Sequence, residues 1–368
     1  MNQVCTRCVM SSKGDPKIQF DENGVCNYCK AAEKELKNGY FPDKTGEKHL
    51  EELFAKIKEE KKNEKYDCMI GLSGGLDSSY LAYLGYQYGL RMLAVHIDDG
   101  FDTEITKNNI KKICDKFNID LITECPDKEQ YADLLRAFIR AGVPDIAIPQ
   151  DNSLFAALYK YAEQNKIEYF LSGSNFALES ILQEGNSYDA SDKVHIKDIH
   201  KKYGEVKLCK DFPLTSTFEK RIKYGKLHKI KTLKPLNYVK YNATDAMKEL
   251  QEACGFEYYG DKHCESIFTR FMQRYYLPEK FNVDKRKSHY SSLILSGQIT
   301  REEALERLEE PLYTEEQLRK DKSYVLKYIG MDQEEFDKIM KEAPKSHDAY
   351  RKSLINRVAH LLVKLRTH

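Results

Sequence analysis

Residues 67–80 combine glycine, hydroxyl and carboxylate groups at a spacing that suits phosphate binding. An apolar run ends in two glycines, which let the backbone turn tightly and bring its N–H groups close to an anion. The helical pattern that follows adds the partial positive charge of a helix N-terminus. The residues assigned to nucleotide binding here are Ser73, Gly74, Gly75, Ser78 and Ser79. Asp77 alone would repel phosphate, so it is expected to hold Mg²⁺.

The same stretch disfavours some nucleotide chemistry. It lacks the lysine of the GxxxxGK[ST] loop, which argues against a kinase or a GTPase. An ordinary strand-to-helix turn can also use two glycines, but it needs neither three hydroxyls nor a carboxylate. The stretch therefore predicts a phosphate cradle with a metal ligand.

Two CxxC pairs, Cys5 with Cys8 and Cys26 with Cys29, are separated by 17 residues. This spacing is typical of tetrahedral zinc held by four thiolates. Four protein ligands leave no open coordination position, so the site is expected to be structural and to fold a segment too small for its own core. An iron–sulfur cluster uses the same thiolates and is the rival interpretation.

From residue 66 onward, predicted strands and helices alternate. Apolar runs predict strands over 67–73, 91–98, 119–123 and 168–171. Helical periodicity predicts helices over 77–88, 103–117, 129–141 and 152–165. The alternation indicates an α/β fold, in which helices cover a parallel sheet that binds ligands at the carboxyl ends of its strands.

The chain is expected to have four regions. They are a zinc-ribbon segment at 1–35, an amphipathic connecting helix within 36–65, an α/β domain at 66–240 and a helical C-terminal domain at 241–368. The sequence has no apolar run of transmembrane length and no signal-peptide pattern, which predicts a cytoplasmic protein without a membrane partner.

The residues from Ser73 to Ser78 resemble the PP-loop, SGGxDS, of the ATP pyrophosphatases. The resemblance implies that ATP is cleaved between its α- and β-phosphates and that the end of the second strand, with His96, Asp98 and Asp99, lies beside the adenosine. It implies nucleotide contacts at a later strand end for Gly173, Ser174 and Asn175. Glu179 is a candidate second Mg²⁺ ligand, although a helix dipole favours a carboxylate there anyway.

A second motif, Gly260-Asp-Lys-His-Cys-Glu265, opens another helical pattern. Its cation suits a leaving pyrophosphate and its imidazole suits proton transfer, so Lys262 and His263 join Asp77 as candidate catalytic residues. An ordinary turn before a helix is the plainer interpretation. Together with the four cysteines, the PP-loop and the chain length, this motif resembles the N-acetyl sugar amidotransferases.

This resemblance implies a bacterial enzyme of O-antigen, pseudaminic acid or legionaminic acid pathways, the last two of which supply sugars that decorate flagellin. Its substrate would be an N-acetylated sugar, nucleotide-linked or nonulosonic. ATP would adenylate the amide oxygen, and ammonia would displace AMP to give an acetamidino group. Residue 2 is Asn and no cysteine lies in a recognisable nucleophile motif. Ammonia is therefore expected from separate glutaminase and cyclase-like subunits, as the resemblance also implies.

Two other functions remain open at this stage. A PP-loop tRNA-modifying enzyme of the thiolase type would fit the zinc ribbon and residues 192–240, which hold 14 Lys and Arg against 5 Asp and Glu. Against it, the remaining cysteines form no CxxC pair, and the net charge of +1 argues against an RNA footprint. A module that senses ATP without chemistry is disfavoured because Asp77 and the serines are all present.

Overall fold

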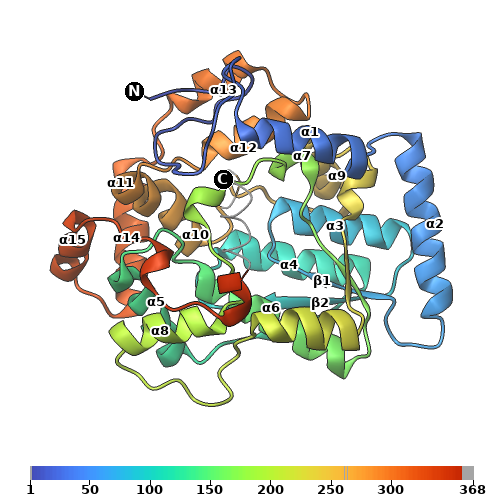
Figure 1. Ribbon diagram of the computed structural model, residues 1–368. Helices are drawn as coiled ribbons and strands as arrows, with labels where there is room; N and C mark the ends of the chain where they lie inside the picture. The colour runs from blue at the N-terminus through green and yellow to red at the C-terminus, as the bar shows by residue number, and fades with distance from the viewer. Residues whose placement is uncertain (1, 261, 263, 359–368) are drawn as a thin grey trace.

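The computed structural model describes residues 2–260, 262 and 264–358 (Figure 1). Within them lies a sheet of five parallel strands in the order β3-β2-β1-β4-β5. The strands are β1 (Cys68–Gly71), β2 (Met92–Ile97), β3 (Asp120–Glu124), β4 (Tyr169–Leu171) and β5 (Lys231–Leu233). The parallel sheet confirms the predicted fold class. Four strands lie where the sequence predicts them, whereas β5 falls inside the lysine-rich stretch and was not predicted.

Helices cover both faces of the sheet (Figure 1). The helices α3 (Leu76–Gln87), α4 (Glu104–Phe117) and α9 (Ala243–Cys254) share one hydrophobic core with β1, and α6 (Ile148–Gln164) covers the opposite face. Successive side chains of a strand point to opposite faces of the sheet. Ile70 therefore packs in the core on the α3 side, and Met69 packs in the core on the α6 side. Burial on both faces explains why the central strands are apolar throughout.

Two helices, α1 (Asn27–Gly39) and α2 (Lys44–Glu60), precede the sheet. The Asp43 side chain accepts hydrogen bonds from the first free N–H groups of α2 and so caps its N-terminus. Leu50, Phe54 and Ile57 form the predicted apolar stripe and are buried in the core of the α/β layer. The predicted connecting helix therefore packs against the sheet domain.

A further hydrophobic core lies beside the sheet and joins helices from both halves of the chain. It contains α5 (Lys128–Ala141), α8 (Lys193–Tyr203), α10 (Ile267–Phe271), η4 (Met272–Tyr276), α11 (Leu277–Phe281), α14 (Glu315–Ile329) and α15 (Gln333–Lys341). Because α5 and α8 precede residue 240 and the other helices follow it, this core crosses the predicted domain boundary. The division at residue 240 therefore remains a prediction. None of the helices among the described residues has the length and apolarity that a bilayer crossing requires.

The remaining elements are short or lie near the N-terminal segment. They are α7 (Phe176–Glu179), η1 (Glu184–Asn186), η2 (Glu219–Leu227), η3 (Pro235–Tyr238), α12 (Arg286–Leu295), α13 (Arg301–Leu308) and η5 (His347–Ala349). In Figure 1, α7, α12 and α13 lie close to the blue N-terminal segment. This grouping places the predicted zinc ribbon against helices that are distant in sequence.

Two buried histidines tie η5 to α8. His195 Nε2 lies 3.0 Å from His347 Nδ1, and the backbone N–H of Asp145 donates to His347 Nε2 over 3.3 Å. His347 must therefore donate from Nδ1 to His195, whose own Nδ1–H donates to the backbone carbonyl of Arg351. Both imidazoles must be neutral for this chain of hydrogen bonds to exist.

We expect this pair to make the protein sensitive to acid. Burial lowers the pKa of His195 to about 4 and that of His347 to about 3. The unfolded chain then binds more protons than the fold below pH 6.5, so stability falls as the pH drops from 6.5 to 4. Urea unfolding should show a loss of roughly 3 kcal/mol for one imidazole of the pair.

His347→Gln should flatten this pH dependence, whereas His49→Gln, which changes an exposed histidine, should leave its slope unchanged. An unaltered slope in the His347 variant would show that other groups cause the acid sensitivity.

Candidate active site

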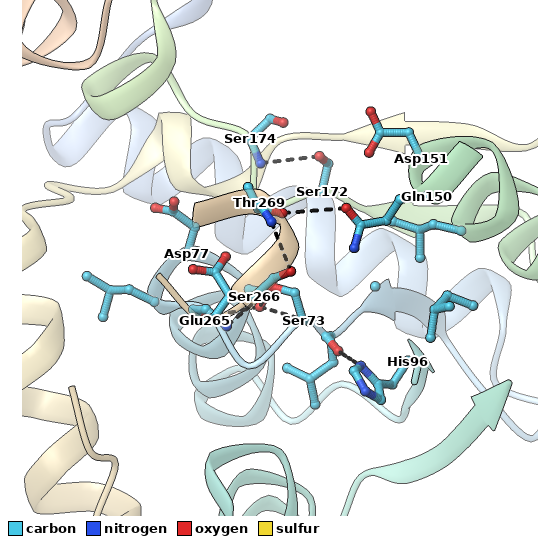
Figure 2. A pocket seen from close by; sticks show the side chains of 18 of the residues that line it. Ser73, Asp77, His96, Gln150, Asp151, Ser172, Ser174, Glu265, Ser266 and Thr269 are labelled. Atoms are coloured by element: carbon cyan, nitrogen blue, oxygen red, sulfur yellow. Dashed lines mark hydrogen bonds between the residues drawn. The ribbon is translucent and has the colours of Figure 1, made fainter. Parts of the chain in front are cut away.

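A cavity of about 490 Å³ opens at the carboxyl ends of β1, β2 and β4 (Figure 2). The glycine-rich loop after β1 forms one wall, and residues just before α10 form another. The polar residues that Figure 2 labels in this cavity are Ser73, Asp77, His96, Gln150, Asp151, Ser172, Ser174, Glu265, Ser266 and Thr269. The three strand ends that the sequence singled out therefore meet in one place.

The loop after β1 has the tight conformation that its glycines predict. Gly74 has φ of +73°, and a Cβ there would lie 2.6 Å from the Thr106 side chain. The Ser73 hydroxyl accepts the Gly75 N–H over 3.2 Å, and the Ser78 hydroxyl accepts the Ser73 N–H over 3.3 Å. The two hydroxyls thus brace the loop and also line the cavity.

The N-terminus of α3 faces the cavity, and Gly75 at the N-cap position has no side chain to cap it. The first helical N–H, that of Leu76, donates to the Tyr259 hydroxyl over 2.7 Å, whereas Asp77 and Ser78 follow it at the same end. Such an end offers backbone N–H groups to an anion. Gly173 packs against this end, since a Cβ at that position would lie 3.3 Å from the Ser78 backbone nitrogen. Two of the five residues assigned to this loop, Gly74 and Ser79, do not line the cavity, and Ser79 is fully buried in α3.

Two side chains fix the carboxylate of Asp77. Asn175 Nδ2 donates to Oδ1 over 3.1 Å, and the hydroxyl of Tyr241 donates to the same oxygen over 2.6 Å. The other oxygen, Oδ2, lies 3.6 Å from Lys262 Nζ. Asn175 therefore acts on Asp77 from outside the cavity. Tyr241 had no predicted role, because its position next to the loop depends on a contact across 164 residues.

Lys262 bridges two of the predicted carboxylates. Its Nζ lies 3.0 Å from Glu179 Oε1 as well as near Asp77, and all three residues line the cavity. Burial alone would lower the pKa of Lys262, but Asp77 and Glu179 raise it above its ordinary value, so the side chain is charged. The other predicted catalytic residue of this motif, His263, lies outside the described residues.

At the end of β2, one of the residues predicted to bind the nucleotide does not line the cavity. His96 lines the cavity, where its Nδ1 donates to the Leu72 carbonyl over 2.9 Å and its Nε2 lies 2.8 Å from Asp102 Oδ2. Burial lowers the pKa of His96, but these two acceptors more than offset that effect and raise it overall. Asp98 does not line the cavity; its neighbour Asp99 does.

Asp99, at the same strand end, is a buried carboxyl group that lines the cavity. Its Oδ2 accepts from the Tyr131 hydroxyl over 2.9 Å and from Gln150 Nε2 over 2.6 Å. Burial, together with the nearby Asp102 carboxylate, raises the pKa of Asp99 to about 6. A polar group that faces inward directly after a strand is difficult to distinguish by sequence from an outward-facing neighbour.

The cavity also has apolar lining residues. They include Leu154, Phe155 and Leu158 of α6 and Phe170 of β4. Backbone donors together with apolar side chains suit a ligand that combines phosphates with a flat base. None of the lysines of residues 192–240, which are all described, lines this cavity.

The four N-terminal cysteines are fully buried, and their sulfur atoms all lie within 4.8 Å of one another. The Sγ atoms of Cys5 and Cys29 are 4.0 Å apart, and those of Cys8 and Cys26 are 3.8 Å apart. Four sulfurs bound tetrahedrally at about 2.3 Å from one ion are about 3.8 Å apart. Among the described residues this is the cluster that could hold a metal ion.

Sequence comparison identifies one family. Residues 265–364 match the family model described as LPS biosynthesis protein WbpG-like, C-terminal domain. The matched region begins at Glu265, the last residue of the second motif, and it supports the family that the sequence resembles. No curated protein matches the chain significantly.

Solved structures give more distant matches. NH3-dependent NAD synthetase from Campylobacter jejuni is 20% identical, over 50% of this chain and 80% of its own, with a TM-score of 0.31. NMN synthetase from Francisella tularensis is 17% identical, over 62% and 93%, with a TM-score of 0.30. The U34-tRNA thiolase NcsA from Methanococcus maripaludis is 15% identical, over 84% and 90%, with a TM-score of 0.33. Likenesses at this level have no bearing on substrate.

Proposed function

We propose that this chain, a member of the WbpG-like family through its C-terminal domain, is an ATP-dependent N-acetyl sugar amidotransferase of bacterial surface-glycan biosynthesis. The observation that carries the proposal is the arrangement around Asp77. Its carboxylate is fixed by Asn175 and Tyr241 at the N-terminus of α3, where Gly75 provides no side-chain cap, with Lys262 next to it. A charged metal ligand beside free phosphate donors suits adenylation by ATP.

The charges of the cavity support Mg²⁺ together with ATP. In the described part of the chain, one lysine lines it against six carboxylate residues, which are Asp77, Asp99, Asp102, Asp151, Glu179 and Glu265. Bare triphosphate would be repelled by such a wall, so a divalent cation must offset the charge. Mg²⁺ is usually bound by one or two carboxylates together with substrate phosphates and water. Asp77 Oδ2 and Glu179 fit that donor set, and bound Mg²⁺ would neutralise developing charge on the phosphates.

The chain's own residues then position the reaction. The loop from Ser73 to Ser78, with the N–H groups of Asp77 and Ser78 at the start of α3, holds the phosphates, and Lys262 stabilises the leaving pyrophosphate. The acetamido oxygen attacks the α-phosphorus as the bond to pyrophosphate breaks. Ammonia then adds to the activated carbon, and the C–O bond breaks to release AMP. The products are the amidine, AMP and pyrophosphate.

We propose that the four cysteines hold one zinc ion with a structural role. Their sulfur spacing suits a single tetrahedral ion, whereas a four-iron cluster would place several metal and sulfide atoms between the thiolates. Backbone N–H groups also face the sulfurs: those of Arg7 and Met10 point to Cys5 and Cys8 over 3.4 Å. Such donors stabilise thiolate charge in a buried site.

Ammonia is proposed to come from separate glutaminase and cyclase-like subunits. Among the described residues, no cysteine lines the active-site cavity. Burial raises the pKa of Cys68 and raises that of Cys114 to about 12, which makes both poor nucleophiles. The exposed Cys125 and Cys209 also lie outside the cavity. The same placement counts against sulfur transfer to tRNA, the alternative function.

Mass spectrometry tests the proposal. The purified protein is incubated with ATP, Mg²⁺, ammonium chloride and a panel of N-acetylated sugars, both nucleotide-linked and nonulosonic. Release of AMP together with replacement of oxygen by NH on one sugar would establish amidination. AMP release with bulk tRNA and no change on any sugar would instead indicate tRNA modification. Absence of AMP with every acceptor would overturn both.

A further inference from the structure

A second, smaller cavity of about 120 Å³ adjoins the active site and is called the side chamber here. It is lined by Gln273 and Arg274 of η4, by Lys285 and α12 residues, and by Leu312. The residues that line both cavities, and so form a shared wall, are Leu178, Glu179, Lys262 and His289. A molecule that enters the side chamber therefore lies next to Lys262.

The two cavities have opposite charge. Among the described residues, the active-site cavity is lined by six carboxylate residues and one lysine. The cations of the side chamber are Lys262, Arg274, Lys285 and Arg286, and Glu179 is its one carboxylate among the described residues. An anionic group is therefore favoured in the side chamber and disfavoured beside the carboxylates, unless a cation accompanies it.

The cations of the side chamber differ in how they are already bound. Arg286 pairs with both oxygens of Asp284 and donates to the Glu310 carbonyl over 2.8 Å, so its charge is largely compensated. Arg274 donates to the Leu312 carbonyl over 3.3 Å. The Lys285 ammonium makes no hydrogen bond and no ion pair with any described residue, and the Gln273 amide makes no hydrogen bond with one. Both line the same small space.

The position of Lys285 is unfavourable without an anion. Burial lowers its pKa, which the more distant carboxylates of Asp145 and Asp15 only partly counter. A partly buried ammonium without a hydrogen-bond acceptor is costly, and a bound carboxylate or phosphate would remove that cost. The position of this group in the lining of a chamber that Lys262 also lines points to a ligand.

We propose that the side chamber binds the anionic group of the acceptor sugar, and that Lys285 determines this specificity by ion pairing. The inference rests on the proposed amidotransferase function, because it places the acceptor next to the nucleotide. A carboxylate or phosphate in the side chamber would direct the rest of the sugar across the shared wall toward Lys262. The chamber is too small for a whole nucleotide, so only part of the acceptor would enter it.

Three acceptors test this proposal: N-acetylglucosamine, its uronic acid 2-acetamido-2-deoxyglucuronic acid, and UDP-N-acetylglucosamine. We expect kcat/KM for AMP release to be highest with an anionic acceptor. The uronic acid and the diphosphate separate the two sources of negative charge. Lys285→Gln should lower kcat/KM for the preferred anionic acceptor by about 10-fold to 100-fold and change the neutral sugar little.

Lys48→Gln, on the exposed surface of α2, is the control that should preserve the preference. Lys285→Arg keeps the charge and should retain most of it, which separates ion pairing from a folding defect. Equal losses for charged and neutral acceptors in Lys285→Gln, or a preference that survives the substitution, would overturn the inference.

Binding measured by isothermal titration calorimetry without ATP separates the two proposals. If no acceptor yields AMP, the proposed function fails. Binding of the uronic acid or UDP-sugar that weakens in Lys285→Gln and not in Lys48→Gln would still support an anion site in the side chamber. Binding that is unaffected by Lys285→Gln would reject it.

Discussion

Asp77→Asn should lower AMP formation by about 10³-fold and leave the fold intact. Asparagine has the same shape, and its Oδ1 can still accept from Asn175 Nδ2 and the Tyr241 hydroxyl. The substitution removes the negative charge of Oδ2, the oxygen that faces Lys262 at 3.6 Å. A neutral amide is a weak ligand for Mg²⁺, so the charge of the triphosphate would remain uncompensated in a cavity lined by other carboxylates.

The matched control is Asp98→Asn. Asp98 follows the neighbouring strand and lies outside the cavity, and an asparagine Oδ1 can still accept its bond from the Gly100 N–H. We expect near-normal turnover in this variant. Thermal unfolding of both variants should stay within a few degrees of the parent protein. If Asp77→Asn retained normal turnover in the presence of Mg²⁺, the assignment of Asp77 as a metal ligand would be wrong.

Tyr241→Phe probes the support of the same carboxylate. It removes the 2.6 Å hydrogen bond to Asp77 Oδ1 without changing the charge of the site. We therefore expect a smaller loss than in Asp77→Asn, with a raised Mg²⁺ requirement measured as the concentration for half-maximal AMP release. Saturating Mg²⁺ should recover most of the activity, because the ligand itself remains.

The parts of the site that the sequence predicts are those encoded by local pattern. The loop from Ser73 to Ser78 is contiguous, so its glycines, hydroxyls and carboxylate reveal both conformation and chemistry. The carboxyl ends of parallel strands necessarily share one edge, which brought His96 and Gly173 into the same cavity. The cysteine cluster is likewise encoded by two short motifs, Cys5–Cys8 and Cys26–Cys29.

The parts that the sequence does not predict depend on distant contacts or on a side chain's direction. Tyr241 reaches Asp77 across 164 residues, and no local pattern marks it. Asp98 and Asp99 have the same chemistry, and only the turn after β2 decides which one faces inward. β5 has three residues, two of them exposed, so it lacks the apolar signal that identified the central strands.

Removal of the metal is the second change that we expect to lower activity strongly. The cysteine cluster supports α12, a helix that lines both cavities. Arg301 of α13 donates to the carbonyls of Cys8 and Cys5, each over 3.1 Å. The Val9 N–H donates to Ser291 on α12 over 3.2 Å. The same helix α12 carries His289, which lies in the wall that the two cavities share. Loss of the metal should therefore disturb the acceptor side of the site as well as the N-terminal segment.

We expect chelation to expose residues 1–35 to protease before any other part of the chain, and to lower AMP release in parallel. Structural zinc contributes roughly 10 kcal/mol or more to the folding of small zinc-binding segments. Cys8→Ser should reproduce the effect, because a serine hydroxyl is a poor zinc ligand. Cys125→Ser, which changes an exposed cysteine outside both cavities, should not.

Metal analysis of the purified protein completes the experiment. One zinc per chain, lost in Cys8→Ser and retained in Cys125→Ser, would agree with the sulfur spacing of the cluster. Iron and sulfide in its place would identify an iron–sulfur cluster. If verified metal loss left the protease sensitivity of residues 1–35 unchanged, contacts such as that of Arg301 with the Cys5 and Cys8 carbonyls would be sufficient to hold the segment in place. The metal would then have no structural role.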